Sequence, residues 1–198
     1  MLYSEVIDNI KNLGFADDDE MVEFAESGVL YDSINRAITE INLNIAPIYG
    51  THELEIDDTD TGYLYVVLPD IDPSFLEFTD TPVLYEQNGK DYYQKFSDYQ
   101  IETENTLVIN ADENKGNFRI FYKMAHTTFT GAEAELTEEV PLMLKVHHLV
   151  PLLASYYVWQ EDEPAKAAQY YNLYEQKSAE VTNEASMKIR MRIMPGGI

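Results

Sequence analysis

Residues 149–176, LVPLLASYYVWQEDEPAKAAQYYNLYEQ, contain two helical patterns separated by a short acidic stretch. The first part, up to Gln160, is apolar and carries no charge. Asp162 or Glu163 can then cap a new helix, and Pro164 suits its first turn because no backbone N–H is needed there. A connection of about two to five residues joins antiparallel helices. The segment therefore predicts a helical hairpin.

Both arms of this hairpin have an apolar face. In the first arm the apolar face is so wide that we expect it to be covered on more than one side. We expect this helix to begin near Pro141, with Thr137 or Glu139 as its cap, and to kink or break at Pro151. In the second arm, small and aromatic residues recur at helical spacing: Ala167, Tyr171, Tyr174, Ser178 and Val181.

The N-terminal region also has a helical period. A first apolar stripe ends at Gly14, and the acids at 17–20 can cap a second helical region. This region continues through an irregular turn at Ser27-Gly28 and ends at Pro47. Its stripe consists of Leu30, Ile34, Ile38, Ile41 and Ile45.

From about residue 48 to 130 the pattern is typical of strands. Short segments rich in aromatic and β-branched residues alternate with turn-forming residues. The segments are THELEID, GYLYVVLP, FLEFTD, PVLYEQ, DYYQKF, NTLVIN and NFRIFYK. Asn88-Gly89 is the strongest hairpin signal. No Lys or Arg occurs between Arg36 and Lys90, so the first half of this β region is strongly acidic.

The expected fold class is α+β: a helical bundle formed by the N- and C-terminal helices, with an inserted antiparallel β domain that is a small sandwich or barrel. We expect the N-terminal helices of the bundle in residues 1–47 and the β insert in 48–130. The C-terminal helical hairpin should occupy 131–186 and an extended basic tail 187–198.

The tail, MKIRMRIMPGGI, has an alternating pattern. Lys188, Arg190 and Arg192 alternate with apolar residues, which favours an extended segment that can add to the sheet of another protein. A frayed terminus is the alternative.

Charge and composition exclude several classes of protein. The chain has 198 residues, a net charge of −23 and no cysteine, so disulfides and thiolate chemistry are excluded and nucleic-acid binding is not expected. The acidity suits either solubility at high local concentration or a surface that DNA passes without adhering. The N-terminal segment lacks the pattern of a signal peptide, and no apolar run reaches the about 20 residues of a membrane span. We expect a soluble protein made in a cytoplasm, without membrane contact.

No motif indicates catalysis or a cofactor. His147 and His148 would point about 100° apart on a helix, so both cannot readily bind one metal. The loop DDTDTG (57–62) lacks the ligands of an EF-hand, although a looser calcium site stays open. Ser74 and Ser155 lack the surroundings of a nucleophile, and no pair of carboxylates stands out. We therefore expect no enzyme activity, no cofactor and no metal.

Taken in order, these patterns resemble those of head–tail connector (adaptor) proteins of tailed bacteriophages, including the tail tubular type with a β insert. The likeness rests on LYDSINRAITEIN (30–42), on LTEEVPLMLKVHHLVPLLASYYVWQEDEPAKAAQYYNLYEQ (136–176), and on helical halves that flank a β region. The long β insert of this chain is a departure from the pattern of the smallest adaptors.

The resemblance implies a structural protein of the virion, made in the host bacterial cytoplasm and located at the head–tail junction. Such proteins form a ring, usually a dodecamer, beneath the portal protein. The ring extends the DNA channel, through which DNA passes without specific binding, and carries neck or tail proteins.

The resemblance also implies two groups of contact residues. A closed ring needs two different contact faces on each subunit. The candidates for the subunit interface are Leu153, Tyr156, Tyr157, Trp159, Tyr170, Tyr171 and Tyr174. In this family C-terminal segments often dock onto the portal, and the matching candidates here are Lys188, Ile189, Arg190, Met191, Arg192 and Ile193.

The residues also allow a function of another class. The chain has 15 tyrosines, which can stack against sugars as well as against proteins. The alternative is therefore a ligand-binding β module on a helical base, of a carbohydrate-binding or baseplate type. Saturable sugar binding would distinguish it from a connector.

Overall fold

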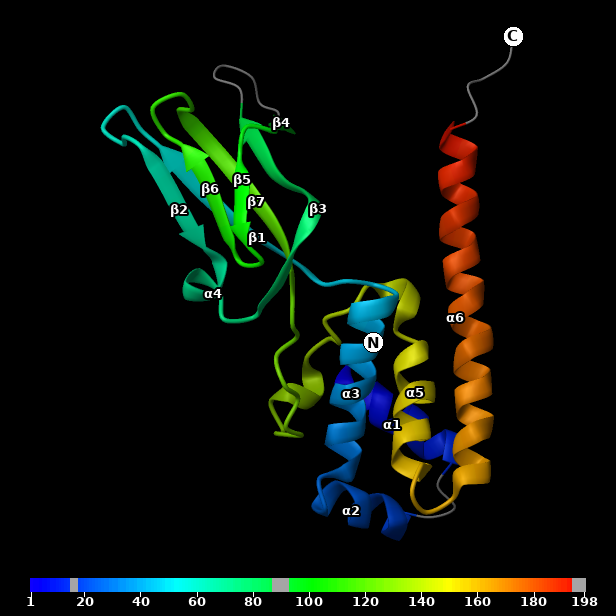
Figure 1. Ribbon diagram of the computed structural model, residues 1–198. Coiled ribbons are helices and arrows are strands. Elements are labelled where there is room, and N and C mark those ends of the chain that lie inside the picture. The colour runs from blue at the N-terminus through cyan, green and yellow to red at the C-terminus, as the bar shows by residue number, and fades with distance from the viewer. Residues whose placement is uncertain (15–17, 87–92, 194–198) are drawn as a thin grey trace. The chain divides into compact units, whose positions relative to one another are not determined.

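The computed structural model describes residues 1–14, 18–86 and 93–193 (Figure 1). The chain contains both helices and antiparallel sheet, so its class is α+β, as predicted. It divides into two compact units. A helical unit comprises Met1–Pro47 and His126–Ile198, and a β unit comprises Ile48–Ala125. The β unit is therefore inserted between two halves of the helical unit.

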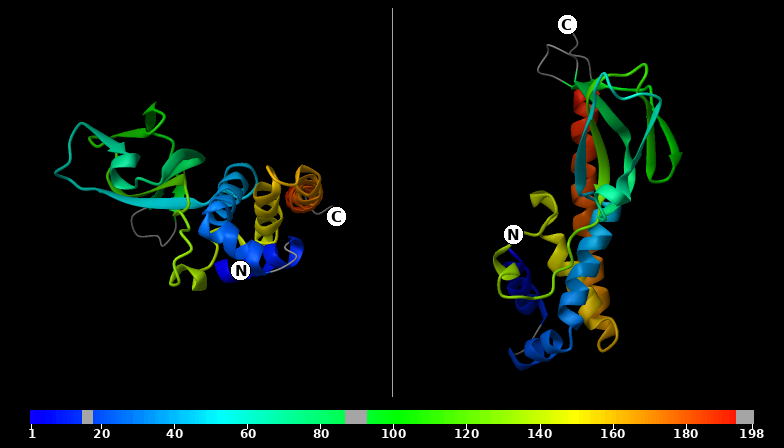
Figure 2. Two further views of the ribbon diagram at one scale, coloured as in Figure 1. Left: turned by 90° about the horizontal axis from the view of Figure 1, so that it is seen from below. Right: turned by 90° about the vertical axis from the view of Figure 1, so that its left-hand side faces the viewer.

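The helical unit is arranged around α5. Its α-helices in the described residues are α1 (Tyr3–Gly14), α2 (Asp18–Glu26), α3 (Val29–Asn44), α5 (Leu149–Trp159) and α6 (Pro164–Ile193). Helix α5 contacts α1, α3 and α6, so most of its side chains are buried. Seen along their axes, α3, α5 and α6 lie in a row (Figure 2).

The predicted N-terminal helices are present. Helix α1 ends at Gly14, and Gly28 separates α2 from α3. Gly28 has a φ of 80°, a conformation that favours glycine and explains the irregular turn. The apolar stripe of α3 faces the core: Leu30, Ile34, Ile38 and Ile41 are buried.

The first arm of the hairpin begins later than predicted. Residues Glu135–Thr137 and Leu144–Val146 form the short 3-10 helices η1 and η2, and α5 starts only at Leu149. Thr137 ends η1, and Glu139 pairs with Leu2 in an isolated antiparallel bridge, so neither caps α5. Pro151 lies in the first turn of α5, where it fits the start of a helix rather than interrupting one.

The second arm begins at Pro164, as predicted, and continues to Ile193. Residues 187–193 are therefore helical, and the prediction of an extended tail was wrong for them. The physical reason is that Met, Lys and Arg are good helix formers, and no proline occurs between Pro164 and Pro195. Residues 194–198 of the predicted tail lie outside the described residues.

The β unit is a small sandwich of two antiparallel sheets. The four-stranded sheet has the order β1 (Tyr49–Ile56), β7 (Gly116–Met124), β3 (Phe75–Glu86), β4 (Tyr93–Lys95). The three-stranded sheet has the order β2 (Tyr63–Val67), β6 (Thr106–Asn110), β5 (Gln100–Thr103), and α4 (Leu68–Ile71) follows β2. Residues from both sheets form one core: Ile56, Val66, Leu68, Val83, Leu107, Ile109, Ala111, Phe118, Ile120 and Tyr122.

Two strands differ from the prediction. The segments FLEFTD and PVLYEQ form one long strand, β3, whose register shifts between Phe78 and Val83. Pro82 lies in this irregular stretch, because a proline cannot donate a ladder hydrogen bond. Strand β5 was not predicted because all its residues are exposed and its pattern is not apolar. The predicted turn at Asn88-Gly89 lies outside the described residues.

The β unit ends at Ala125, five residues before the boundary expected at 130. Phe129 belongs to the helical unit because Asn35 of α3 binds both of its backbone groups. Asn35 Nδ2 donates to the carbonyl of Phe129, and its Oδ1 accepts from the N–H of Phe129, each at 2.8 Å. The Phe129 ring also stacks on Tyr3, with centroids 4.1 Å apart.

Candidate functional site

Four of the seven candidates for a subunit interface are buried within the helical unit: Leu153, Trp159, Tyr170 and Tyr174. The Trp159 ring meets Phe24 edge-on at 5.4 Å, and the Lys166 ammonium lies 3.2 Å from its centroid. The hydroxyl of Tyr170 donates to the carbonyl of Leu13. We therefore correct the assignment of these four side chains: they pack the hairpin against the N-terminal helices and leave little surface for a partner.

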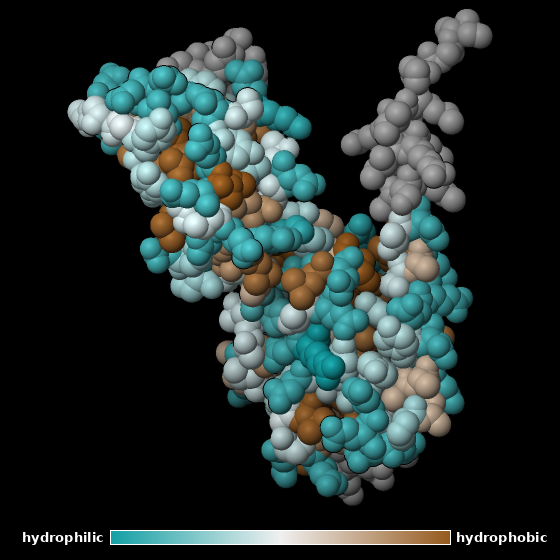
Figure 3. Space-filling view, in the orientation of Figure 1, coloured by the Kyte–Doolittle hydropathy of each residue, from teal (hydrophilic) through white to brown (hydrophobic). Residues whose placement is uncertain are grey.

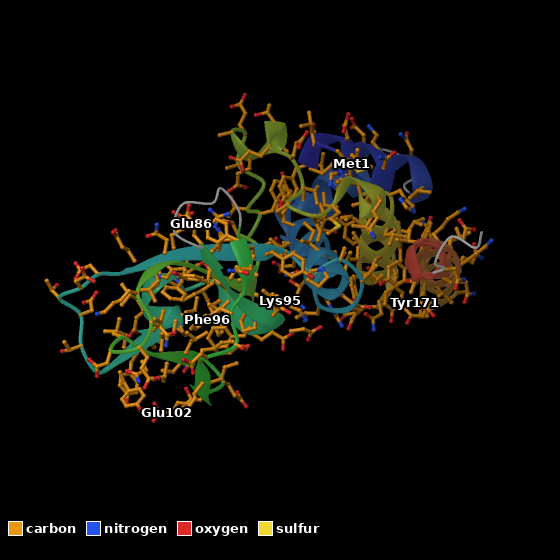
Figure 4. All side chains as sticks on the ribbon, turned by 90° about the horizontal axis from the view of Figure 1, so that it is seen from above. Met1, Glu86, Lys95, Phe96, Glu102 and Tyr171 are labelled. Carbon is orange, nitrogen blue, oxygen red and sulfur yellow. The ribbon has the colours of Figure 1, made fainter. Side chains whose placement is uncertain are left out.

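The other three candidates form a continuous aromatic group. The ring of Tyr156 lies 5.0 Å from that of Tyr157 and 5.0 Å from that of Tyr171, measured between centroids. Tyr171 is 37% exposed, and Figure 4 shows it next to α6 at the edge of the helical unit. We call Tyr156, Tyr157 and Tyr171 the tyrosine surface. It is the part of the predicted interface that a partner can reach.

Helix α3 adds a pair of opposite charges to the tyrosine surface. The guanidinium of Arg36 lies 4.0 Å from the ring centroid of Tyr157, and the Tyr157 hydroxyl donates to the carboxylate of Glu40. Burial and this hydrogen bond raise the pKa of Tyr157, so the phenol stays protonated as a donor. The sequence analysis missed this pair. The available signal was that Arg36 is the only lysine or arginine between Lys11 and Lys90.

The surface of the helical unit is mixed in polarity. On the face shown in Figure 3, apolar patches among the helices are small and are separated by polar atoms. Leu43, which is 56% exposed, lies three residues after Glu40 on the same face of α3. A polar and aromatic surface of this kind is typical of protein contacts that form after folding.

The β unit contains a shallow hollow of about 160 Å³ on its three-stranded sheet. Tyr63 and Tyr65 of β2 are 62% and 59% exposed and, being two residues apart, point to the same side of the sheet. In the sheet, Tyr63 pairs with Asn110, and Gln100 pairs with Val108. The lining residues are Tyr63, Asp98, Tyr99, Gln100, Val108, Asn110 and Glu113. The hollow thus combines aromatic rings with amide and carboxylate groups.

This hollow lies on the side of the sheet that faces away from the core. Leu64 and Val66, which alternate with the two exposed tyrosines, pack toward the core. Figure 4 shows Phe96 pointing between the sheets, whereas Glu102 of β5 lies at the outer edge of the β unit. The polar side of β5 is therefore available to a ligand.

The loop DDTDTG binds a cation from its own chain. Lys115 Nζ donates to the carbonyl of Asp57 at 2.7 Å and to that of Asp60 at 2.5 Å. Within the loop, Asp57 Oδ1 accepts from the N–H and the hydroxyl of Thr59 at 2.7 and 2.5 Å. A lysine ammonium thus binds two backbone carbonyls of the loop for which the sequence left a calcium site open. Among the described side chains, no group of three His, Asp or Glu residues is arranged to hold a metal ion.

The two histidines lie between η2 and α5 rather than in the predicted helix, and their surroundings differ. His147 is buried, and its Nε2 donates to the carbonyl of Leu142 at 2.7 Å while its Nδ1 lies 2.8 Å from the backbone nitrogen of Met1. His148 is exposed. Both nitrogens of His147 are therefore engaged in packing the helical unit.

The two serines have local roles. Ser74 donates from its N–H and its hydroxyl to Asp72 Oδ1, at 2.9 and 2.6 Å, which closes a turn. Ser155 is buried in α5, and within the described residues its hydroxyl has no hydrogen-bond partner. In this part of the chain neither serine forms a hydrogen bond with a histidine.

The candidates for portal docking, Lys188 to Ile193, lie in the last turns of α6. Their backbone is helical, and the contacts of their side chains lie outside the described residues. In the described part of the chain, no helix is both long and apolar enough to cross a membrane.

No protein-family model matches the chain, and no curated protein matches its sequence.

Proposed function

We propose that this chain is a structural protein of a tailed-bacteriophage virion: a head–tail connector that forms a ring under the portal and extends the DNA channel. The observation that carries the proposal is the arrangement of the units. Two helical halves, far apart in sequence, pack around α5, and a compact β sandwich is inserted between them. We interpret the helical unit as the bundle of the connector plan.

In this proposal each part of the chain has its own task. The tyrosine surface contacts a neighbouring subunit, and the β unit contacts neck or tail proteins. The end of α6, from Lys188 to Ile193, reaches the portal. The net charge of −23 repels the phosphates of passing DNA, so DNA moves through the ring without specific binding. The protein is made in the cytoplasm of the host bacterium and ends in the virion.

The proposal is tested by the mass of the protein in solution. Light scattering over a concentration series, with negative-stain images at the highest concentration, should reveal annular particles of one fixed symmetry. The same measurement is made after mixing with the portal protein of the same phage. A monomer at every concentration, both alone and with the portal, contradicts the connector.

A specific observation favours the second candidate function, a carbohydrate-binding β module. The hollow on the three-stranded sheet places the exposed Tyr63 and the partly buried Tyr99 beside amides and carboxylates, which can stack on a sugar ring and bind its hydroxyls. A glycan array with the full chain tests this function. Saturable binding that Tyr63→Ala abolishes supports the module, whereas a connector shows no saturable sugar binding.

A further inference from the structure

The turn around η2 exposes two large apolar side chains that are adjacent in sequence. Leu144 is 78% exposed, the highest value among the large apolar side chains of the described residues, and Met143 is 48% exposed. Lys145, the next residue, is also exposed. We call Met143, Leu144 and Lys145 the η2 turn. Neither of the two candidate functions above gives these side chains a role.

The backbone of the η2 turn is ordered. The N–H of Val146 donates to the carbonyl of Met143 at 3.0 Å, and the N–H of His147 donates to the carbonyl of Leu144 at 3.3 Å. Leu142 and Val146, which flank the turn, are buried in the helical unit. The exposed apolar side chains therefore belong to a fixed turn between two buried residues. Apolar side chains that are exposed as a group on an ordered surface mark a contact site for another protein.

The tyrosine surface has the chemistry that complements the η2 turn. It already contacts one cation, because the guanidinium of Arg36 lies 4.0 Å from the ring centroid of Tyr157. The faces of tyrosine rings attract ammonium and guanidinium groups, and they also pack against aliphatic side chains. The tyrosine surface therefore suits a partner that presents a cation next to apolar side chains.

Two carboxylates give the tyrosine surface a net negative charge. The Tyr157 hydroxyl donates to Glu40. The charge of Glu175 raises the pKa of Tyr171, and the charge of Glu40 contributes to the same shift, so both carboxylates lie near the rings. With the single guanidinium of Arg36, the sum of these charges is negative. The surface is thus complementary in charge to an ammonium group such as that of Lys145.

The η2 turn and the tyrosine surface lie on opposite sides of the helical unit. The backbone nitrogen of Met1 lies 2.8 Å from Nδ1 of His147, and the N–H of Val140 donates to the carbonyl of Met1 at 3.0 Å. The segment that contains the η2 turn therefore passes beside Met1. Figure 4 shows Met1 and Tyr171 on opposite sides of the row formed by α3, α5 and α6. A chain consequently cannot place its η2 turn on its own tyrosine surface.

We propose that the η2 turn of one copy binds the tyrosine surface of a second copy. Met143 and Leu144 pack against the tyrosine rings, and the Lys145 ammonium lies near the rings and the two carboxylates. The contact joins two different surfaces, so it is head-to-tail and closes into a ring when the rotation between copies allows it. The inference rests on the proposed function, in which the tyrosine surface contacts a neighbouring subunit, and it names the surface of that neighbour.

Two variants of the full chain each remove one side of the contact. The turn variant carries Leu144→Ser, and the tyrosine variant carries Tyr171→Ala. The matched controls also remove an exposed apolar side chain: Val22→Ser in α2, at a residue that is 54% exposed, and Leu173→Ala in α6, at one that is 44% exposed. Leu173 is two residues from Tyr171, so it points to another side of the helix. Circular dichroism verifies the fold of each variant.

Sedimentation velocity over a concentration series gives the readout. The wild-type and control proteins should self-associate, and added salt should weaken the association. The turn and tyrosine variants should each associate at least about tenfold more weakly. Lys145→Gln should have a smaller effect at low salt and should make the association less dependent on salt. A turn variant that associates like the wild type overturns the contact.

Mixing the two variants distinguishes a head-to-tail contact from a symmetric one. The mixture is measured at a concentration at which each variant alone is monomeric. The intact tyrosine surface of the turn variant can bind the intact η2 turn of the tyrosine variant, but no third copy can add. An equal mixture should therefore form dimers and nothing larger. A mixture that stays monomeric, or that forms larger species, overturns the contact.

Failure of this contact is distinct from failure of the connector. Rings that persist in the turn variant leave the connector standing and overturn the contact. A wild-type chain that is monomeric alone but forms rings with the portal protein overturns the contact between free copies and supports the connector.

Discussion

Asn35 joins two segments of the helical unit that are 94 residues apart in sequence. Its amide binds both backbone groups of Phe129, which fixes the segment after the β unit against α3. We expect Asn35→Ala to lower the free energy of unfolding by about 1–3 kcal/mol, because two partly buried backbone groups lose their partner. Urea unfolding measures the change. Asn172→Ala, at an exposed position of α6, is the control and should change stability little.

Asp72 in the β unit makes a pH-dependent contribution to stability. Hydrogen bonds from the hydroxyls of Ser74 and Tyr122, and from the Ser74 N–H, hold the pKa of Asp72 below its usual 3.8. Because the folded pKa lies below the unfolded one, this contribution is present above pH 3.8 and is lost as the pH falls through the folded pKa. We expect Asp72→Asn to destabilise the protein at neutral pH and the difference to shrink in acid. Urea unfolding at several pH values measures the free energy of unfolding of both proteins, with the exposed Asp70→Asn as control. If Asp72→Asn lowers that free energy equally at all pH values, the Asp72 carboxylate does not make the pH-dependent contribution.

At the scale of elements, the end of α1 packs directly against the α5–α6 hairpin. A Cβ atom on Gly14 would lie 2.6 Å from Tyr170 Oη and 3.0 Å from Trp159 Nε1. Replacing glycine by alanine within a helix normally stabilises it. We nevertheless expect Gly14→Ala to cost about 1–3 kcal/mol, because the side chain overpacks this contact. In a Tyr170→Phe background the cost should be smaller, and a double-mutant cycle by chemical unfolding measures the difference. Equal costs in both backgrounds contradict this packing.

The elements show which parts of the fold the sequence can predict. The isoleucine stripe of α3 and the start of α6 at Pro164 depend on local spacing and capping, and both predictions were correct. Leu142 and Val146 are buried at helical spacing, yet the backbone between them forms no α-helix. There the Leu142 carbonyl accepts from the ring nitrogen of His147, five residues later, a contact that a periodic pattern does not reveal.

The candidate surfaces were less predictable for a related reason. An apolar stripe on a helix indicates which side chains are covered by other atoms. It does not indicate whether those atoms belong to another helix of the same chain or to another protein. Trp159 and Tyr170 meet the N-terminal helices, whereas Tyr171 remains accessible. A hollow of the helical unit is lined by Tyr3 and by residues from 127 to 141, and only the folded chain shows that they are neighbours.

For the whole molecule, the β unit behaves as an insert whose two ends meet. The N–H of Met124 donates to the carbonyl of Ile48 at 3.0 Å, so the chain enters and leaves the β unit at adjacent points. We expect the helical unit to fold when residues 48–125 are replaced by a short Gly/Ser linker. Circular dichroism and cooperative thermal unfolding of the shortened chain check this. A non-cooperative transition would mean that the helical unit depends on its insert.

The lysine in the DDTDTG loop leads to a further expectation for the molecule as a whole. We expect a metal chelator to leave the thermal unfolding temperature unchanged, because Lys115 already binds the loop carbonyls. Lys115→Met, which keeps the stem and removes the charge, should lower that temperature by differential scanning calorimetry. A chelator-sensitive wild-type protein contradicts this view of the loop.

The ammonium group of Lys115 is covalently part of the chain, so its presence in the loop does not depend on the concentration of ions in solution. Extracellular calcium-stabilised modules depend on an ion that is scarce inside cells, so they acquire their final rigidity only after export. The turn between β1 and β2 has no such requirement, since its counter-charge arrives with Lys115 during folding. For a particle assembled in one ionic environment and used in another, the β unit would have the same shape in both.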